Sequence, residues 1–321
     1  MSTLYIDRSN LELRLEGCAL TFYEDDRRVG TVPTAPLERV VLRGAARIEA
    51  QAVAKLGELG VGVIFLCGRR HEPVLFLPRM HNDAERRINQ CVLSRNEEFR
   101  RLAALDVVRA KIDAQAGFLR ARAEELSGAA PERLLAAVAE LKKLRGALDV
   151  KSGDASIRGV EGSAAKAYFS GLSSLFPAEL GFTTRNRRPP RDPVNAVLSL
   201  GYVLLYADAT MAAHETGLDP FVGFLHRTEF SRHSLACDLM EPARPLIDRF
   251  ALNLFLEGEL ALRYFSTTAS GCFMQKEARV IFYKAYEKAA VEWRALVKAR
   301  ARKLADDILR ASNLPSLSQT A

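Results

Sequence analysis

The sequence lacks the long apolar run that a membrane-spanning helix requires. Its most apolar stretch, residues 194–207, is interrupted by Asn195 and Ser199 and is shorter than the roughly 20 residues that cross a bilayer. The first residues, MSTLYIDRSN, include an early aspartate and no apolar segment typical of a secretory signal. We therefore expect a cytoplasmic protein with no membrane partner.

Cysteine is scarce, and the five cysteines form no recognisable pattern. Their number is odd and no Cys-x-x-Cys pair occurs, which argues against a zinc ribbon or a disulfide framework. We interpret them as small buried side chains in a reducing compartment. The sequence also has no P-loop, G-x-G-x-x-G fingerprint or G-x-S-x-G turn, which disfavours nucleotide, dinucleotide and α/β-hydrolase sites.

Positive charge, by contrast, is in excess. The 321 residues include 46 Lys and Arg against 39 Asp and Glu, a net charge of +7, and 35 of those 46 cations are arginine. Arginine pairs bidentately with phosphate, so the balance favours a nucleic-acid partner. A GC-rich genome would produce the same arginine excess, so the charge alone does not decide the function.

The hydrophobic pattern changes its period near residue 80. Leu11, Leu13 and Leu15 alternate with charged residues, as in a half-buried strand. Short apolar runs predict further strands near 4–6, 20–23, 29–32, 40–42, 61–66 and 74–77, with a helix over 48–59.

After Pro78 the spacing is helical. We predict a helix capped by Asp83 that continues to Ile112, and one that Pro131 opens and that ends near Leu148. Further helices are predicted near 155–175, 193–215, 233–258 and 275–311, the second of them capped by Asp192. The predicted fold class is α+β, with a β-rich N-terminal domain (1–80), a larger all-α catalytic domain (85–312) and a flexible tail (313–321).

Three segments contain residues suited to chemistry. In the first, Glu161 lies beside the apolar face of a predicted helix, between Gly159 and Gly162. Small neighbours allow a ligand or another backbone to approach the carboxylate. The alternative is a solvated glutamate whose glycines serve packing.

The second segment combines His226 with Asp238 and Glu241. The two acids are spaced i, i+3 and share one helix face, and apolar neighbours make unpaired carboxylates costly there. Two carboxylates and an imidazole suit Mg²⁺ or Mn²⁺, and the imidazole favours Mn²⁺. By itself, His226 also fits a buried structural histidine.

The third segment, residues 184–193, places four arginines before a helix. Paired prolines extend the chain, so this loop can bind phosphates or can simply be a basic surface loop. Attack on a phosphodiester requires an in-line oxygen nucleophile and neutralisation of the developing charge, both of which a divalent metal supplies. Arginines and a lysine such as Lys276 can bind the remaining phosphates.

Together these segments resemble a known family. The stretches RGVEGSAAKAYF, RNRRPPRDPVNAVLSLGYVLLY, GLDPFVGFLH and SLACDLMEPARPLIDR, in this order and spacing, are similar to the CRISPR-associated integrase, the first of the numbered Cas proteins. The opening LYIDRSNLELRLEG is similar to that family's first strands, so the resemblance covers nearly the whole chain.

The resemblance implies a metal-dependent DNA endonuclease and integrase acting in CRISPR adaptation. Its reaction would insert a short spacer duplex into a CRISPR array, each 3′-hydroxyl attacking a phosphodiester at the repeat border. It also implies double-stranded DNA as the partner, a homodimer formed through the β-rich domains, and a heterohexamer in which two such dimers flank a dimer of the second numbered Cas protein.

Carried over by position, the resemblance assigns the metal ligands to Glu161, His226 and Glu241. It implies that Asp238 contacts these ligands without binding the metal itself. No departure occurs at the three ligand positions. It further implies that four cations contact DNA or brace the site: Arg185, Arg188, Arg191 and Lys276. Because His226 must be neutral to bind a metal, we expect the metal affinity to fall as the pH drops through the histidine pKa.

Two other functions remain compatible with the sequence. A DNA-binding scaffold without catalysis would use the positive charge for binding and the Glu and His side chains for structure. A related transposon integrase would use the same site, and only the neighbouring genes would separate it from a CRISPR integrase.

Overall fold

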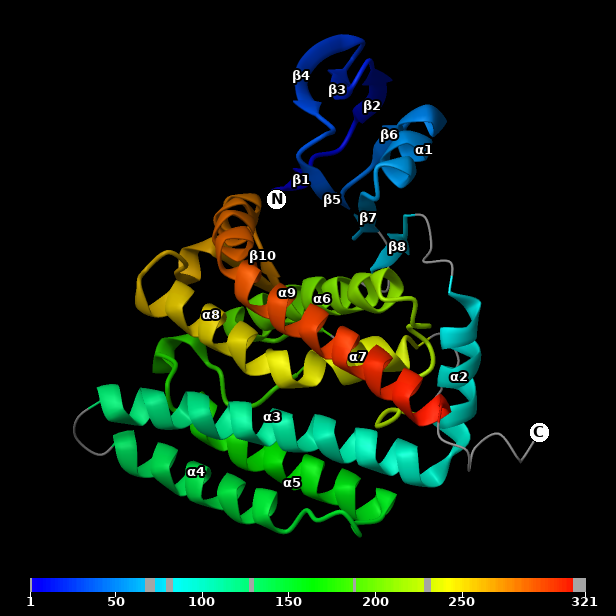
Figure 1. Cartoon of the computed structure of the whole chain (residues 1–321). Helices are drawn as coiled ribbons and strands as arrows, with labels where there is room; N and C mark the ends of the chain where they lie inside the picture. The colour runs from blue at the N-terminus through cyan, green and yellow to red at the C-terminus, as the bar shows by residue number, and fades with distance from the viewer. Residues whose placement is uncertain are drawn as a thin grey trace. The chain divides into compact units, whose positions relative to one another are not determined.

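The structure is a computed structural model that describes residues 2–66, 73–78, 83–126, 130–186, 189–227 and 232–313. The chain divides into two compact units, Met1–Asn82 and Asp83–Ala321, and each unit is described by itself. Figure 1 traces the elements of both.

The N-terminal unit contains two four-stranded sheets and one helix. One sheet has the strand order β1-β5-β7-β8 and the other β4-β3-β2-β6. In the first sheet β1, β5 and β7 are parallel and β8 is antiparallel to β7. The elements are β1 (Ser2–Asp7), β2 (Leu11–Glu16), β3 (Ala19–Glu24), β4 (Arg27–Pro33), β5 (Leu37–Arg43), β6 (Ala46–Ile48), α1 (Ala50–Glu58), β7 (Gly62–Phe65) and β8 (Val74–Phe76).

Alternation along β2 directs its leucines into the core of this unit. Leu11 and Leu13 are buried among residues of β3, β5 and α1, whereas Leu15 packs against them partly exposed. The turn between β3 and β4 is tight, because Asp25 and Asp26 both have positive φ, as a two-residue hairpin loop requires. Ile48, predicted to begin the helix, instead ends strand β6.

The second unit is mostly helical and confirms the predicted fold class. Its elements are α2 (Ala84–Arg95), α3 (Glu97–Glu125), α4 (Ala130–Gly146), α5 (Asp154–Ser173), η1 (Ala178–Leu180), α6 (Pro193–Glu215), α7 (Ser234–Met240), η2 (Glu241–Ala243), α8 (Arg244–Leu256), η3 (Leu262–Tyr264), β9 (Phe265–Thr268), β10 (Gly271–Met274) and α9 (Lys276–Ser312). The antiparallel hairpin of β9 and β10 is a feature that helical spacing did not predict.

One predicted helix is two helices. The chain breaks at Asn96, whose backbone is extended and whose side chain accepts a hydrogen bond from Phe99 N, so that Asn96 caps α3. Asp83 caps α2 as predicted, through Arg86 N. The prediction of one continuous helix to Ile112 was therefore wrong.

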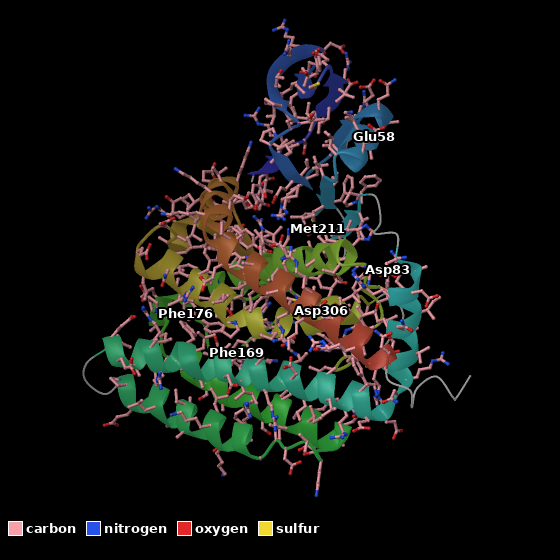
Figure 2. All side chains as sticks on the ribbon, viewed as in Figure 1. Glu58, Asp83, Phe169, Phe176, Met211 and Asp306 are labelled. Carbon is pink, nitrogen blue, oxygen red and sulfur yellow. The ribbon has the colours of Figure 1, made fainter. Side chains whose placement is uncertain are left out.

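Helix α6 forms the centre of the helical unit. Asp192 caps it as predicted, by accepting a hydrogen bond from Asn195 N, and Pro193 occupies its first turn. In the part of the chain that the structure describes, α6 alone is long and apolar enough to cross a bilayer, but 78% of its most apolar window is buried inside the unit. Side chains such as Met211 on α6 and Phe176, both labelled in Figure 2, are buried in this core.

The cysteines correct one expectation. The four that the structure describes are free, in agreement with the absence of a disulfide pattern. Cys272 is buried, but Cys18 and Cys91 are exposed, so they are not all packed in the interior.

Candidate active site

Helix α5 presents Glu161 at the border between core and solvent. Ile157, Ala164 and Tyr168 on the neighbouring face are buried, whereas the Glu161 side chain is 31% exposed. A Cβ added at Gly159 or Gly162 would meet nothing within 4 Å. The two glycines therefore do not pack closely against another part of the described chain, which leaves this stretch of α5 open.

Glu241 lies where the predicted helix over 233–258 is interrupted. Pro242 and Pro245 have no backbone N–H, so the helical hydrogen bonds to the residues four positions earlier cannot form. The chain passes from α7 through the 3₁₀ turn η2 into α8. This turn buries Glu241, which is 4% exposed, and its Oε1 accepts a hydrogen bond from Arg244 Nε at 2.8 Å.

The two glutamates meet at a third residue, Lys111 of α3. The Lys111 ammonium contacts Glu161 Oε1 and lies 2.6 Å from Glu241 Oε2. The second contact has the length of a hydrogen bond but is poorly directed, and Glu241 Oε2 has no well-formed hydrogen bond within the described chain. One positive charge thus occupies a position reached by carboxylates from two elements.

The pKa of Glu241 reflects these neighbours. Burial by itself would raise the pKa of this carboxyl, but the charges of Arg244 and Lys111, with a smaller effect of His226, hold it well below its usual range. Glu241 is therefore ionised throughout the physiological pH range and keeps a full negative charge in a buried position.

Asp238 holds the loop that carries His226. One of its oxygens accepts hydrogen bonds from the backbone N–H groups of Phe224 and Leu225, at 2.6 and 3.0 Å. The other accepts from His226 N at 3.0 Å and lies 2.7 Å from His226 Nδ1. Because a proton on Nδ1 completes this contact, Nε2 keeps its lone pair and can bind a metal.

The loop needs a glycine at position 223. A Cβ there would lie 2.8 Å from the backbone carbon of Ser234 and 2.9 Å from the carbonyl oxygen of His226. This close approach lets the loop lie against the start of α7. Asp238, further along α7, then accepts hydrogen bonds from three N–H groups of the loop.

The chemistry of these side chains suits a divalent metal, although their present positions do not form a complete coordination shell. Among the residues that the structure describes, no three His, Cys, Asp or Glu side chains converge on one point. However, Glu241 Oε2 is a buried oxygen without a well-formed hydrogen bond, and a cation already bridges it to Glu161. The donor set of two carboxylates and an imidazole fits Mn²⁺ or Mg²⁺.

A buried tyrosine–aspartate cluster lies behind the glutamates and was not predicted. Asp248 of α8 accepts hydrogen bonds from Tyr168 of α5, at 2.7 Å, and from Tyr202 of α6. Burial raises the pKa of Asp248 to about 6, although both tyrosines and Arg244 oppose the shift. One signal was available in the sequence for Tyr168, which lies seven residues, or two helical turns, after Glu161 on the same predicted helix.

The arginine loop contributes to the same cluster. The Arg185 guanidinium donates to Asn195 Oδ1 at 2.7 Å and to Ser199 Oγ at 3.0 Å, and it lies 5.3 Å from the centre of the Tyr202 ring. Arg185 therefore points into the protein, whereas Arg191 and Lys276 are exposed. Arg188 lies outside the described residues.

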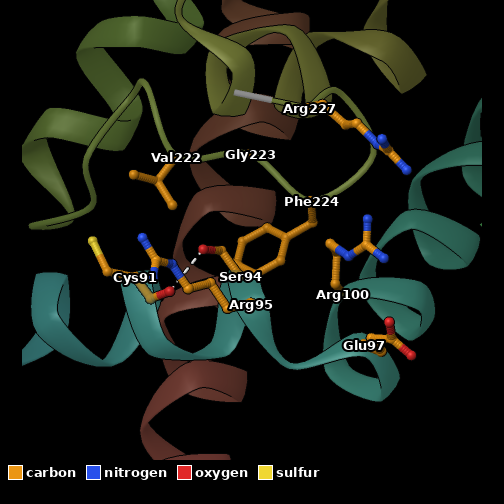
Figure 3. A pocket seen from close by; sticks show the side chains of 9 residues that line it. All are labelled: Cys91, Ser94, Arg95, Glu97, Arg100, Val222, Gly223, Phe224 and Arg227. Carbon is orange, nitrogen blue, oxygen red and sulfur yellow. Dashed lines mark hydrogen bonds between the residues drawn. The ribbon is translucent and has the colours of Figure 1, made fainter. Parts of the chain in front are cut away.

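A groove of about 560 Å³ adjoins the loop that carries His226. Its lining includes Ser94, Arg95, Arg100, Phe224 and Arg227, and Figure 3 shows Arg100 and Arg227 on the same side of Phe224. Arg100 is also paired with Asp154 at 2.7 Å. The lining thus combines three arginines with the acid Glu97 next to the loop that carries His226.

Comparisons with known proteins show which family the chain resembles. The family model described as CRISPR associated protein Cas1 matches residues 4–288. A CRISPR-associated endonuclease Cas1 of Thermodesulfovibrio yellowstonii is 36% identical over 315 residues, which are 96% of this chain and 98% of that protein.

Solved structures share the fold. A Cas1 protein from Thermotoga maritima superposes with a TM-score of 0.82 at 27% identity, covering 96% of this chain and 97% of the other. A casposase bound to its integration product gives a TM-score of 0.81 at 21% identity, with 100% and 94% covered. At that identity the casposase shows a common fold only.

Proposed function

The chain belongs to the Cas1 family of CRISPR-associated proteins, and from that premise we propose that it is a metal-dependent DNA endonuclease and integrase that inserts spacer DNA into a CRISPR array. The observation that carries the proposal is the meeting of Glu161 and Glu241 at one cation position. A chain that used its charge for binding alone would have no need to bury a carboxylate there.

In this proposal Glu161, Glu241 and His226 hold a divalent metal, Mg²⁺ or Mn²⁺. A bound metal would polarise a phosphoryl oxygen and lower the pKa of an attacking hydroxyl. The imidazole favours Mn²⁺ over Mg²⁺ because Mg²⁺ prefers a shell of oxygen atoms.

The remaining side chains orient these three. Asp238 fixes the His226 ring through Nδ1 and fixes its loop through three N–H groups. Arg244 holds one oxygen of Glu241 and lies 4.7 Å from the centre of the Tyr202 ring. We infer that Arg185 braces this cluster rather than touching DNA, while Arg191 and Lys276 are available to phosphates.

The reaction we propose is a transesterification. The 3′-hydroxyl oxygen of the incoming strand forms a bond to phosphorus, and the bond from phosphorus to the 3′-oxygen on the other side of the repeat border breaks. The leaving oxygen takes up a proton, so one phosphodiester replaces another. Cleavage by the isolated protein would follow the same course with water as the nucleophile.

The partners follow from the same proposal. The helical unit would bind double-stranded DNA through its basic surface, and the β-rich unit would form a homodimer. Two such dimers would flank a dimer of the second numbered Cas protein in a heterohexamer. A cytoplasmic location accords with action on the chromosome.

A strand-joining assay tests the proposal. The purified protein, with and without the partner protein, is incubated with a labelled duplex and a plasmid that carries a repeat array, in Mn²⁺ or in EDTA. We expect a labelled plasmid that requires both the metal and Glu161, and its loss in Glu161→Gln. Glu179→Gln, the same change at an exposed glutamate, is the matched control.

The alternatives predict other results. A scaffold would bind the duplex with strong salt dependence and give no joined product under any condition. A transposon integrase, which the casposase fold keeps as the second candidate, would join ends that match terminal inverted repeats beside its own gene rather than a spacer beside a repeat array.

A further inference from the structure

The position of Lys111 between the two glutamates is unusual for a lysine. Its side chain is 8% exposed, and its ammonium contacts carboxylates from α5 and from η2. A buried ammonium is stable only where opposite charges compensate for its lost hydration. We propose that Lys111 is a built-in placeholder cation, which holds Glu161 and Glu241 together before a divalent metal binds and which that metal must displace.

The packing of helix α3 holds the backbone of Lys111 beside the two carboxylates. Helix α3 packs against both α5 and η2, and Val108 and Ile112, which flank Lys111 on α3, are completely buried. The backbone at Lys111 is thus anchored by packing, whereas its flexible four-carbon side chain can swing. The ammonium can leave the carboxylates while the helix stays in place.

The charges indicate competition rather than coexistence. Glu161 and Glu241 carry two negative charges, which Lys111 and Arg244 balance with two positive ones. A divalent cation that joined the carboxylates beside Lys111 would meet two like charges. A cation that replaced Lys111 would meet only Arg244, so displacement is the arrangement that electrostatics favours.

The test measures metal binding directly and rests on the metal site of the proposed function. Mn²⁺ is titrated into the full chain by calorimetry, and the thermal midpoint Tm is measured with Mn²⁺ and with EDTA. For Lys111→Met we expect Mn²⁺ to bind about tenfold or more tightly than to the wild type, and a larger Mn²⁺-induced rise of Tm. Lys111→Gln, which keeps a hydrogen-bond donor without the charge, provides the same comparison should Lys111→Met fail to fold.

The control variants separate charge from shape. Lys111→Arg keeps the competing charge and should bind Mn²⁺ no more tightly than the wild type. Lys166→Met removes the charge of an exposed lysine on α5 and should leave Mn²⁺ binding unchanged.

The outcomes distinguish this inference from the proposed function. If Glu161→Gln abolishes Mn²⁺ binding while both neutral Lys111 variants bind Mn²⁺ as the wild type does or more weakly, only the placeholder role is overturned. If Glu161→Gln binds Mn²⁺ as the wild type does, the metal lies elsewhere, and the proposed site and the role of Lys111 fail together.

Discussion

At the residue scale, Asp238 organises the loop that carries His226. It is 2% exposed and accepts three backbone hydrogen bonds besides its contact with His226 Nδ1. An asparagine would turn one acceptor into a donor that faces other donors. For Asp238→Asn we expect a free energy of unfolding lower by about 2 kcal/mol or more and strand joining reduced about 10- to 100-fold.

Urea unfolding and the joining assay measure these two effects. Asp306→Asn makes the same change at an exposed position (Figure 2) and should alter neither quantity. An Asp238→Asn protein with wild-type stability and activity would show that the loop does not depend on this carboxylate.

Asp248 gives a prediction on pH at the same scale. Its pKa is raised from 3.8 to about 6 in the folded protein, so between these values the folded state binds more protons than the unfolded state. The contribution of Asp248 to stability is therefore fully present below pH 3.8 and is lost as the pH rises through about 6. Above pH 6, the wild type carries a charge that its surroundings disfavour.

Asp248→Asn removes this dependence, because the amide stays neutral at every pH. We expect the stability of this variant relative to the wild type to improve by about 2 kcal/mol between pH 4.5 and pH 7.5, which is the part of the effect of this pKa shift that falls within the window. Urea unfolding of both proteins at the two pH values measures the change. A relative stability that is constant, or that falls over this range, would refute the assignment.

At the element scale, the approach of the His226 loop to α7 depends on Gly223. Gly223→Ala would force a methyl group against the Ser234 backbone, so we expect the loop to move and Mn²⁺ affinity to fall about tenfold or more. Gly117→Ala, in open space on α3, should instead stabilise the helix by about 0.5–1 kcal/mol. Equal Mn²⁺ affinity of the two variants would contradict the role of Gly223.

Elements were predictable from the sequence where one local signal dominated. Alternating leucines predicted β2, and the pair of Asp192 and Pro193 indicated the start of α6. The break at Asn96 was missed because apolar spacing continues across it, although Asn96 is also a good capping residue. The hairpin of β9 and β10 is short and lies within a helical unit, where its strands have little apolar alternation to reveal them.

The candidate site was predictable only in part, because some of its residues have no local signal in the sequence. The four motifs identified Glu161, His226, Asp238 and Glu241 as candidates, and those assignments stay predictions until variants are measured. Lys111 carried no local signal, because its partners lie 50 and 130 positions further along the chain. A buried lysine is recognised only when the carboxylates that stabilise it are brought to it by tertiary packing.

At the scale of the whole molecule, the net charge of +7 predicts strongly salt-dependent binding to duplex DNA. For Arg191→Ala we expect the slope of log affinity against log salt concentration to become shallower by about 0.9, the effect of one lost phosphate contact. Fluorescence anisotropy between 50 and 200 mM salt measures the slope. Arg133→Ala, at an exposed position on α4, is the control, and equal slopes for the two variants would remove Arg191 from the DNA interface.

The meeting of α3, α5 and η2 also has a consequence for the synthesis of the protein. A ribosome makes Lys111 first, Glu161 50 residues later and Glu241 80 residues after that, so a nascent chain lacks the last carboxylate until three quarters of the chain exist. Any product that ends before η2 therefore lacks Glu241, so the carboxylate pair around Lys111 is completed only late in synthesis.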